Sequence, residues 1–458
     1  MFERLSKGLI PNRADSSPPG PGPLDNLLFH LEFARDQVAA YETMFEAYGP
    51  TVRLWIGPFD MFLVTEPELV EEILLRKAGS FHKDAVTSEL EMFLGKGLLI
   101  SEGDLWRRQR KLVAPSLQRR QIAHYADVMV EQTERGVDGW EEGQELDFHR
   151  DITEITLRIV VQALFDLQME GRLERIAGAI DDTMEFVDEI RHSAWRFAPD
   201  AIKSPKERRF EAARDHLDAI IYDLIDRRRA RDGEGDDLLY RLLAATDEEG
   251  NQMTDEQLRD EVITLFLAVH ETTALAITYA WHLLAKNPAA ADRLVEEVDE
   301  VIGGEQPGFE HARQLPYTEA IFQESMRLYP PAWAVGRQPT EDVEIGDYTI
   351  PKGAQVIMPS CLIHRDERWY DDPEAFRPER WLEDLEDQIP RFAYFPFGGG
   401  PRICVGNHFA RMEAILVIAT IAQHYTFDHL GPDELTTYHS ITQRPEESIR
   451  LRARRRSS

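Results

Sequence analysis

The sequence is poor in cysteine, in positive charge and in long apolar runs, and each shortage excludes a class of protein. Among its 458 residues only Cys361 and Cys404 are cysteines, so disulfides cannot hold the fold together. Lys and Arg number 52 against 83 Asp and Glu, and the formal net charge of −31 opposes binding to nucleic acid or to an anionic membrane. No run of about 18 consecutive apolar residues is present, and the N-terminus lacks the apolar core of a signal peptide. Composition therefore predicts a cytoplasmic protein with no membrane span.

Apolar periodicity outlines a mostly helical chain with small sheets. Hydrophobic residues make up 43% and charged residues 29% of the sequence, enough for a large core in a soluble protein. Residues 78–101 read as a long irregular region, and the last arginines as a solvated end. Alternation predicts strands over Thr51–Trp55 and Met61–Val64, and a hairpin sheet over 343–350 and 354–359. The spacing predicts helices over Asp36–Tyr48, Glu66–Leu75, Asp104–Leu112, Thr254–Lys286, Tyr317–Leu328 and Phe409–Ile421.

One cysteine stands at the end of a glycine-rich turn. The segment runs Phe-Gly-Gly-Gly-Pro-Arg-Ile-Cys-Val-Gly over residues 397–406, just before an apolar helical run. Glycine allows a tight turn and a close approach of the backbone to a flat ligand. A thiolate near a helix start is stabilised by the helix dipole and by backbone N–H groups, which suits a soft anionic metal ligand. The alternative is a buried, inert structural cysteine.

This segment resembles the haem-binding loop of the cytochrome P-450 superfamily at Phe397, Gly400, Arg402, Cys404 and Gly406. The resemblance implies haem b as cofactor, with Cys404 as the thiolate ligand of its iron. It also implies that Phe397 and Arg402 contact the haem. Arginine rather than histidine at position 402 resembles the fatty-acid-hydroxylase and membrane-type branches.

A second segment, Ala268-Val269-His270-Glu271-Thr272-Thr273, resembles the oxygen-activation helix of the same family. The resemblance implies that Glu271 and Thr272 deliver protons to dioxygen. Val269 departs from the usual glycine. A zinc-protease motif is excluded, because the second histidine it needs is Ala274. A threonine bonded to its own helix backbone is the structural alternative.

Further matches concern the surroundings of the haem. Trp106 and Arg110, four residues apart and so on one helix face, match a pair that binds a haem propionate, and Arg337 matches a second such contact. Glu324 and Arg327 match an acid–base pair that joins a distant arginine, here Arg380, in a buried network behind the haem. The basic residues 107, 108, 110, 111, 119 and 120 predict a docking face for an acidic electron donor.

The resemblance implies the cytochrome P-450 fold, as one catalytic domain over 24–458 after a flexible, proline-rich lead over 1–23. It implies insertion of one oxygen atom from dioxygen into a lipophilic substrate, namely a fatty acid, terpenoid or steroid. Electrons would come from a separate ferredoxin or flavodoxin with its NAD(P)H reductase. A peroxygenase or rearrangement enzyme, and a haem carrier or sensor, are the other two classes. The expected pocket residues are Leu94, Leu98, Phe266, Ala268, Val269, Val335 and Ile441.

Overall fold

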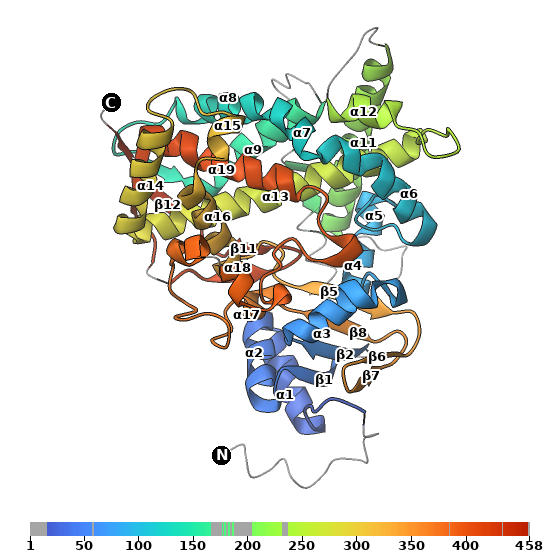
Figure 1. The fold of residues 1–458 in the computed structure, drawn as a ribbon. Coiled ribbons are helices and arrows are strands. Elements are labelled where there is room, and N and C mark those ends of the chain that lie inside the picture. Colours follow the sequence, from blue (N-terminus) through green and yellow to red (C-terminus); the bar gives the residue numbers. More distant parts are fainter. Residues whose placement is uncertain are drawn as a thin grey trace. The chain divides into compact units, whose positions relative to one another are not determined.

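The structure, a computed structural model, describes residues 16–56, 59–165, 176, 178–179, 182–183, 186, 204–230, 237–383, 385–432 and 434–456 (Figure 1). The chain forms two compact units. Unit 1 comprises residues 1–88, 320–404 and 434–447, and unit 2 comprises residues 89–319, 405–433 and 448–458. Most of the predicted lead, residues 1–15, lies outside the described residues, and the single catalytic domain over 24–458 stays a prediction.

Unit 1 is built on a five-stranded sheet of order β1-β2-β8-β5-β3, in which only β2 and β8 pair in parallel. Its strands are β1 (Thr51–Ile56), β2 (Phe59–Val64), β3 (Phe81–His82), β5 (Val335–Pro339) and β8 (Gln355–Met358). Two hairpins accompany it, β6 (Val343–Ile345) with β7 (Tyr348–Ile350), and β10 (Thr437–His439) with β11 (Gln443–Pro445). The prediction that 354–359 joins the 343–350 hairpin is wrong. Strand β8 instead lies between β2 and β5, where Val356 and Met358 are fully buried.

Short helices surround this sheet. Helix α2 begins where the sequence predicts, because Asp36 Oδ1 accepts the N–H groups of Val38 and Ala39 at 3.0 Å each. Residues 78–101, predicted to be irregular, contain strand β3 and three short helical elements, and helix α1 was not predicted. The helical elements of this unit are α1 (Pro23–Phe33), α2 (Gln37–Tyr48), α3 (Pro67–Glu71), the π-helical turn η2 (Glu72–Arg76), η3 (Ala78–Ser80), α17 (Ser360–Ile363), η7 (Pro378–Glu383), α18 (Leu385–Gln388), η8 (Arg391–Ala393) and η9 (Gly400–Arg402). Two more, α4 (Ala85–Glu89) and α16 (Pro316–Leu328), cross the boundary between the units in sequence.

Unit 2 is helical and is organised around α13 (Asp255–Lys286), which packs against α9, α11 and α19 (Figure 1). The predicted capping box starts α13, with Thr254 Oγ accepting the N–H of Gln257. Among the described residues, α13 is the one helix that passes a length-and-composition test for a membrane span. Its most apolar window is 83% buried, as in the core helix of a soluble protein. The other helices are α5 (Glu91–Leu94), α6 (Gly103–Val113), η4 (Ala114–Leu117), α7 (Arg119–Ile122), η5 (Ala123–Tyr125), α8 (Ala126–Val137), α9 (Phe148–Phe165), α11 (Pro205–Ala230), α12 (Leu238–Ala244), α14 (Pro288–Val301), α15 (Phe309–Ala312) and α19 (Asn407–His424).

The basic C-terminal residues form a strand, so the prediction of a solvated end is wrong. Strand β12 (Arg450–Arg455) is the centre of an antiparallel sheet with β4 (Glu145–Asp147) and β9 (Tyr425–His429). Leu451 and Ala453 are fully buried, and they alternate with arginines that point outward. These arginines pair with acids: Arg450 and Arg452 with Glu145, and Arg454 with Glu142 and Asp428.

Candidate functional site

The cysteine loop of unit 1 is a tight turn that leaves Cys404 exposed and outside any disulfide. The Cys404 N–H donates to the carbonyl oxygen of Phe397 at 3.0 Å, and the Ile403 N–H donates to that of Gly400 at 3.1 Å. Phe397 and Arg402 are half-buried. In sequence, α19 begins three residues after Cys404. The loop therefore presents one accessible thiol on a backbone fixed by its own hydrogen bonds.

Gly400 can be no other residue without moving the loop. Its φ of +64° is in the left-handed region, and a Cβ there would lie 1.8 Å from the carbonyl oxygen of Leu74, in η2. A Cβ on Gly399 would lie 2.3 Å from the Phe392 ring. The glycines thus serve close packing of the loop against the rest of unit 1.

Two other predicted site residues of unit 1, Val335 and Arg337, lie in strand β5, and a third, Ile441, lies between β10 and β11. Arg337, expected to bind a haem propionate, is 7% exposed, and its Nη1 donates to the Gly336 carbonyl at 2.7 Å. Val335 and Ile441, two expected pocket residues, are half-buried.

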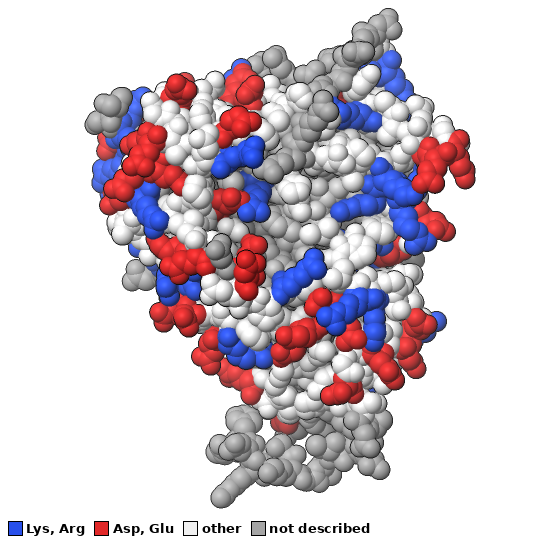
Figure 2. Space-filling model, in the orientation of Figure 1, with Lys and Arg blue, Asp and Glu red and all other residues white. Residues whose placement is uncertain are grey.

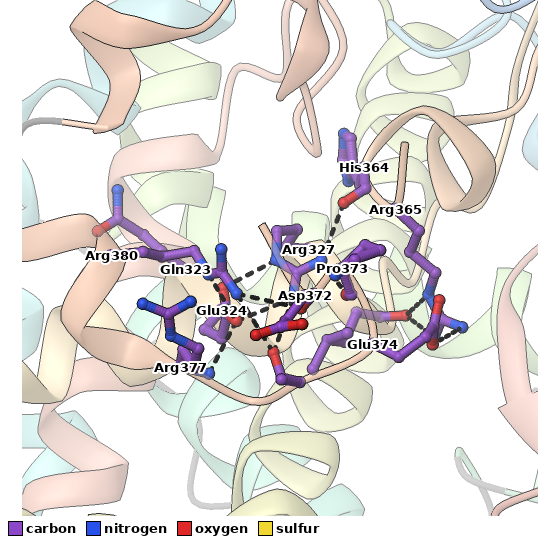
Figure 3. A network of polar contacts seen from close by, with 12 residues as sticks. Gln323, Glu324, Arg327, His364, Arg365, Asp372, Pro373, Glu374, Arg377 and Arg380 are labelled. Atoms are coloured by element: carbon purple, nitrogen blue, oxygen red, sulfur yellow. Dashed lines mark hydrogen bonds and ion pairs between the residues drawn. The ribbon is translucent and has the colours of Figure 1, made fainter. Parts of the chain in front are cut away.

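Glu324 is the centre of a buried polar network (Figure 3). Its carboxylate accepts two bonds from Arg327, at 2.8 and 2.9 Å, and one from Arg380 Nε at 3.1 Å. The Trp381 indole N–H at 2.8 Å and the Arg377 backbone N–H at 2.9 Å complete its partners. The side chains of Glu324 and Arg327 are both 0% exposed. The three residues that the sequence placed in this network are therefore in contact.

The free donors of Arg327 extend this network into the segment that precedes the cysteine loop. They donate to the carbonyl oxygens of His364, Pro373 and Ala375 at 3.0, 2.6 and 3.1 Å. Burial and the Arg327 charge lower the pKa of His364 to about 3, so its ring is neutral. His364 Nε2 can then accept the N–H of Phe395 at 3.0 Å. This support role of His364 was not predicted.

In unit 2, α13 brings Ala268 and Thr272 to one face, because they are four residues apart. Ala268 is exposed and Thr272 half-buried, whereas Phe266, Val269 and Glu271 are each buried. Thr272 Oγ donates to the Ala268 carbonyl oxygen at 2.6 Å, as the structural alternative expects. The hydroxyl oxygen still has lone pairs with which to accept a proton or a hydrogen bond.

Helix α6 places Trp106 and Arg110 on one face, both half-buried. Figure 2 shows Lys and Arg side chains gathered in the region of α6 with Asp and Glu side chains beside them, and three of these basic side chains are paired with acids. Arg108 Nε pairs with Asp247 at 2.7 Å, Lys111 pairs with Glu248 at 2.7 Å, and Arg107 pairs with Asp104. The Arg108 hydrogen bond lowers the pKa of Asp247 to about 2. Three of the six residues of the predicted docking face are therefore paired with acids, and the side chains of Arg119 and Arg120 are not among those that the structure describes.

Two fully buried acids of unit 2 were missed, although one of them, Glu413, interrupts an apolar helical run. Glu413 on α19 is 0% exposed, and burial raises its pKa well above the usual range against the opposing effect of Thr273. Glu261 on α13 is also 0% exposed, and its carboxylate accepts the N–H of Leu98 at 3.1 Å. Leu94 and Leu98, the two expected pocket residues of this loop, are buried.

We expect Glu324→Ala to lower the free energy of unfolding by about 3–5 kcal/mol, because it leaves the buried charges of Arg327 and Arg380 uncompensated. Glu310→Ala is the matched control. Glu310, in α15, and Arg313, which directly follows α15, have the same spacing in sequence, but they are exposed and 3.9 Å apart, so their pair contributes less than about 1 kcal/mol. Urea titration of both variants measures the difference, and equal losses would contradict the buried network.

Comparison with known proteins identifies the family. The family model described as Cytochrome P450 matches residues 18–451. Cyclooctatin synthase of Streptomyces melanosporofaciens is 36% identical over 384 residues, covering 82% of each chain. Pentalenene oxygenase of Streptomyces avermitilis is 31% identical over 388 residues, covering 83% of this chain and 84% of the other. The crystal structure of the cytochrome P450DA heme domain superposes with a TM-score of 0.87 at 25% identity, covering 97% of this chain and 99% of that one. The chain belongs to the cytochrome P450 family, the haem b monooxygenases.

Proposed function

We propose that this chain hydroxylates or epoxidises a terpenoid, with haem b held by Cys404. The observation that carries the proposal is the exposed Cys404 thiol at the end of a loop whose Gly400 admits no side chain. We further propose that the chain works in the cytoplasm and that residues 24–458 act as one catalytic domain.

The residues present fit a haem. Thiolate sulfur is a soft ligand that suits iron, and Cys361, the only other cysteine, is buried. Burial raises the pKa of the Cys361 thiol to about 12, which keeps it protonated and unsuited to metal binding. We propose that Arg337, Trp106, Arg110 and Arg402 hold the haem by hydrogen bonds, charge and contact. Haem b, when bound, supplies the redox chemistry that splits dioxygen and transfers one oxygen atom to the substrate.

The chain's own part in the reaction is to deliver protons. We propose that the Thr272 hydroxyl donates its proton toward dioxygen and that its Oγ accepts a replacement proton, with Glu271 as the acid that supplies it. The exposure of Ala268, one turn before Thr272, supports an accessible reaction side on this face of α13.

The terpenoid assignment rests on relatives and on apolar side chains. A second relative from Streptomyces melanosporofaciens, a cyclooctat-9-en-7-ol 5-monooxygenase, is 31% identical over 386 residues. Its name denotes an alkenol, and the name of the pentalenene oxygenase denotes an alkene. All seven residues expected to line the pocket are apolar. An arginine clamp for a fatty-acid carboxylate is not among them. These observations favour a terpenoid over the fatty acids and steroids that the sequence also allowed.

Cytochrome P450 monooxygenases take electrons from redox partners, and we propose a ferredoxin or flavodoxin with its NAD(P)H reductase. The bacterial relatives support this proposal. Because Arg107, Arg108 and Lys111 are paired with acids and Arg110 is assigned to the haem, the docking of an acidic donor would depend on Arg119 and Arg120, which follow α6 in sequence. The rate of reduction by a purified ferredoxin, measured at increasing salt concentration, reports how much these charges contribute to docking.

Replacing Cys404 by serine should abolish the thiolate-type absorption of the reduced carbon-monoxide complex, because a hard hydroxyl replaces the soft thiolate. Cys361→Ser is the control and should keep that absorption. If Cys404→Ser kept the parent spectrum, the ligand assignment would be wrong.

Thr272→Ala should keep haem binding while product per NAD(P)H falls by about tenfold or more, with hydrogen peroxide released instead. Thr278→Ala is matched to it, because Thr278 Oγ makes the same bond to the carbonyl four residues earlier, at 2.7 Å, and is fully buried. Product and peroxide assays of both variants measure the coupling. If Thr272→Ala formed as much product per NAD(P)H as the parent, Thr272 would have only the structural role of bonding to the Ala268 carbonyl.

Terpene hydrocarbons and alcohols should shift the haem absorption of the ferric protein at concentrations on the order of 10 micromolar. Burying about 300 Å² of apolar surface contributes about 7 kcal/mol. Titration of terpenes, fatty acids and steroids of matched size compares the classes. Tighter binding of a fatty acid than of every terpenoid tested would contradict the terpenoid assignment.

A further inference from the structure

Two consecutive acids near the start of α13 hold the loop of residues 95–98. The Lys96 N–H donates to Asp260 Oδ2 at 2.7 Å, and the Leu98 N–H donates to Glu261 Oε2 at 3.1 Å. The loop lies directly against the helix, because a Cβ on Gly97 would be 2.1 Å from Thr264 Oγ. These contacts fix the position of the loop by hydrogen bonds and by close packing together.

Glu261 lies on the same face of α13 as Ala268 and Thr272. Those residues follow Glu261 by seven and eleven positions, and at 100° per residue all three point within about 20° of one direction. Along the axis they lie about 10 and 16 Å from Glu261. Glu261 thus occupies the N-terminal end of the helix face that carries the proposed proton donor.

Glu261 is held in an environment that does not suit a charge. Its side chain is fully buried, and its second oxygen, Oε1, has no hydrogen-bond partner among the residues that the structure describes. No ion pair of Glu261 is found in that part of the chain either. Burial raises its pKa to about 8, the Leu98 N–H opposes this, and the neighbouring Asp260 charge adds to it.

The basic side chains near Glu261 are paired with other residues or exposed to solvent. From α13 itself, Arg259 pairs with Asp260 at 3.0 Å, and it also pairs with Asp218 of α11 at 2.5 Å. Helix α6 contributes Arg108, which bonds to Gln257 and Asp247, and the loop contributes Lys96, whose side chain is exposed. The proton of Glu261 is therefore lost most easily when the loop opens and water reaches the carboxylate.

We propose that Glu261 is a positioning residue that clamps the loop Gly95–Leu98 to α13 in its protonated form, and that loss of its proton opens the loop to the passage of substrate. The second half of this inference rests on the proposed function, because Leu94 and Leu98 are assigned to the pocket there. The first half depends only on the contacts between the loop and the helix.

The direction of the pH effect follows from proton linkage. In the closed loop the pKa of Glu261 is about 8, so the carboxyl keeps its proton up to about that pH. In the open loop Glu261 is an ordinary carboxyl with the usual pKa of 4.5. At a pH between these two pKa values, opening of the loop releases a proton. The equilibrium constant for opening therefore rises by up to about tenfold per pH unit in this range. Above pH 8 the carboxyl is ionised in both forms and the dependence levels off.

Hydrogen exchange of the Leu98 amide in the full-length haem protein tests the clamp. After correction for intrinsic exchange, its protection should fall by up to about tenfold per unit between pH 5 and 8 and then become constant. Glu261→Gln keeps an acceptor for the amide and should remove the slope while retaining protection. Glu261→Ala removes the acceptor and should lower protection at every pH. Glu256→Gln, on an exposed acid of the same helix, should behave as the parent.

Gly97→Ala provides a second route if Glu261→Ala does not fold, because it displaces the loop and leaves Glu261 in place. It should also lower the protection of Leu98. A parent protein without the slope, or a Glu261→Gln variant with the parent's slope, would overturn the clamp.

Ligand passage is measured with 4-phenylimidazole, whose dissociation is followed by stopped-flow absorption of the haem. Its dissociation rate should rise at least threefold from pH 6 to pH 8 in the parent and stay level in Glu261→Gln. A rate that rises equally in both proteins would overturn the role in substrate passage. Failure of the haem assignment appears separately, in the Cys404→Ser spectrum, and does not affect hydrogen exchange at Leu98.

Discussion

The organisation of unit 1 depends on one buried carboxylate. Glu324 offsets the charges of Arg327 and Arg380 at a place where both arginines are buried. Because removing charges from water costs several kcal/mol per ion, each of these contacts requires the others. The remaining donors of Arg327 reach backbone carbonyls of a segment that has little regular structure. The network thus gives long loops the fixed geometry that a sheet or helix would otherwise provide.

Buried acids perform different tasks in the two units. Glu324 is paired with two arginines and fully bonded. Glu413 and Glu261 are buried without a cation among the residues that the structure describes, and burial raises the pKa of each. A group of the first kind gives rigidity, since its partners cannot leave without exposing a charge. A group of the second kind is sensitive to its surroundings, because a small gain in water access changes its charge.

Local signals made much of the fold predictable. Helix starts at Asp36 and Thr254 have capping residues that act over three positions, and the structure has helices beginning just after both. The cysteine loop has its glycines where the backbone needs them, at Gly400 above all. These features depend on neighbours in the chain, which the sequence displays directly.

Contacts between distant segments were not predictable in the same way. The pairing of β8 with β2, and of Arg108 with Asp247, joins residues far apart in sequence. The alternation of Leu451 and Ala453 with arginines is typical of a strand, but the many arginines led to the prediction of a solvated end instead. Glu261 carries no local signal for its partner, because the Leu98 amide lies 163 positions away.

The central place of β12 has a consequence for how the chain is made. Its partner β4 ends at Asp147 and pairs with Arg450, so the sheet closes a loop of about 300 residues. Until residue 455 has been synthesised, β4 and β9 have no strand between them, and α13 belongs to a unit whose sheet is incomplete. Such non-local closure slows folding and leaves apolar surface exposed during synthesis. Completion of unit 2, and hence the maturation of the enzyme, therefore requires translation through residue 455.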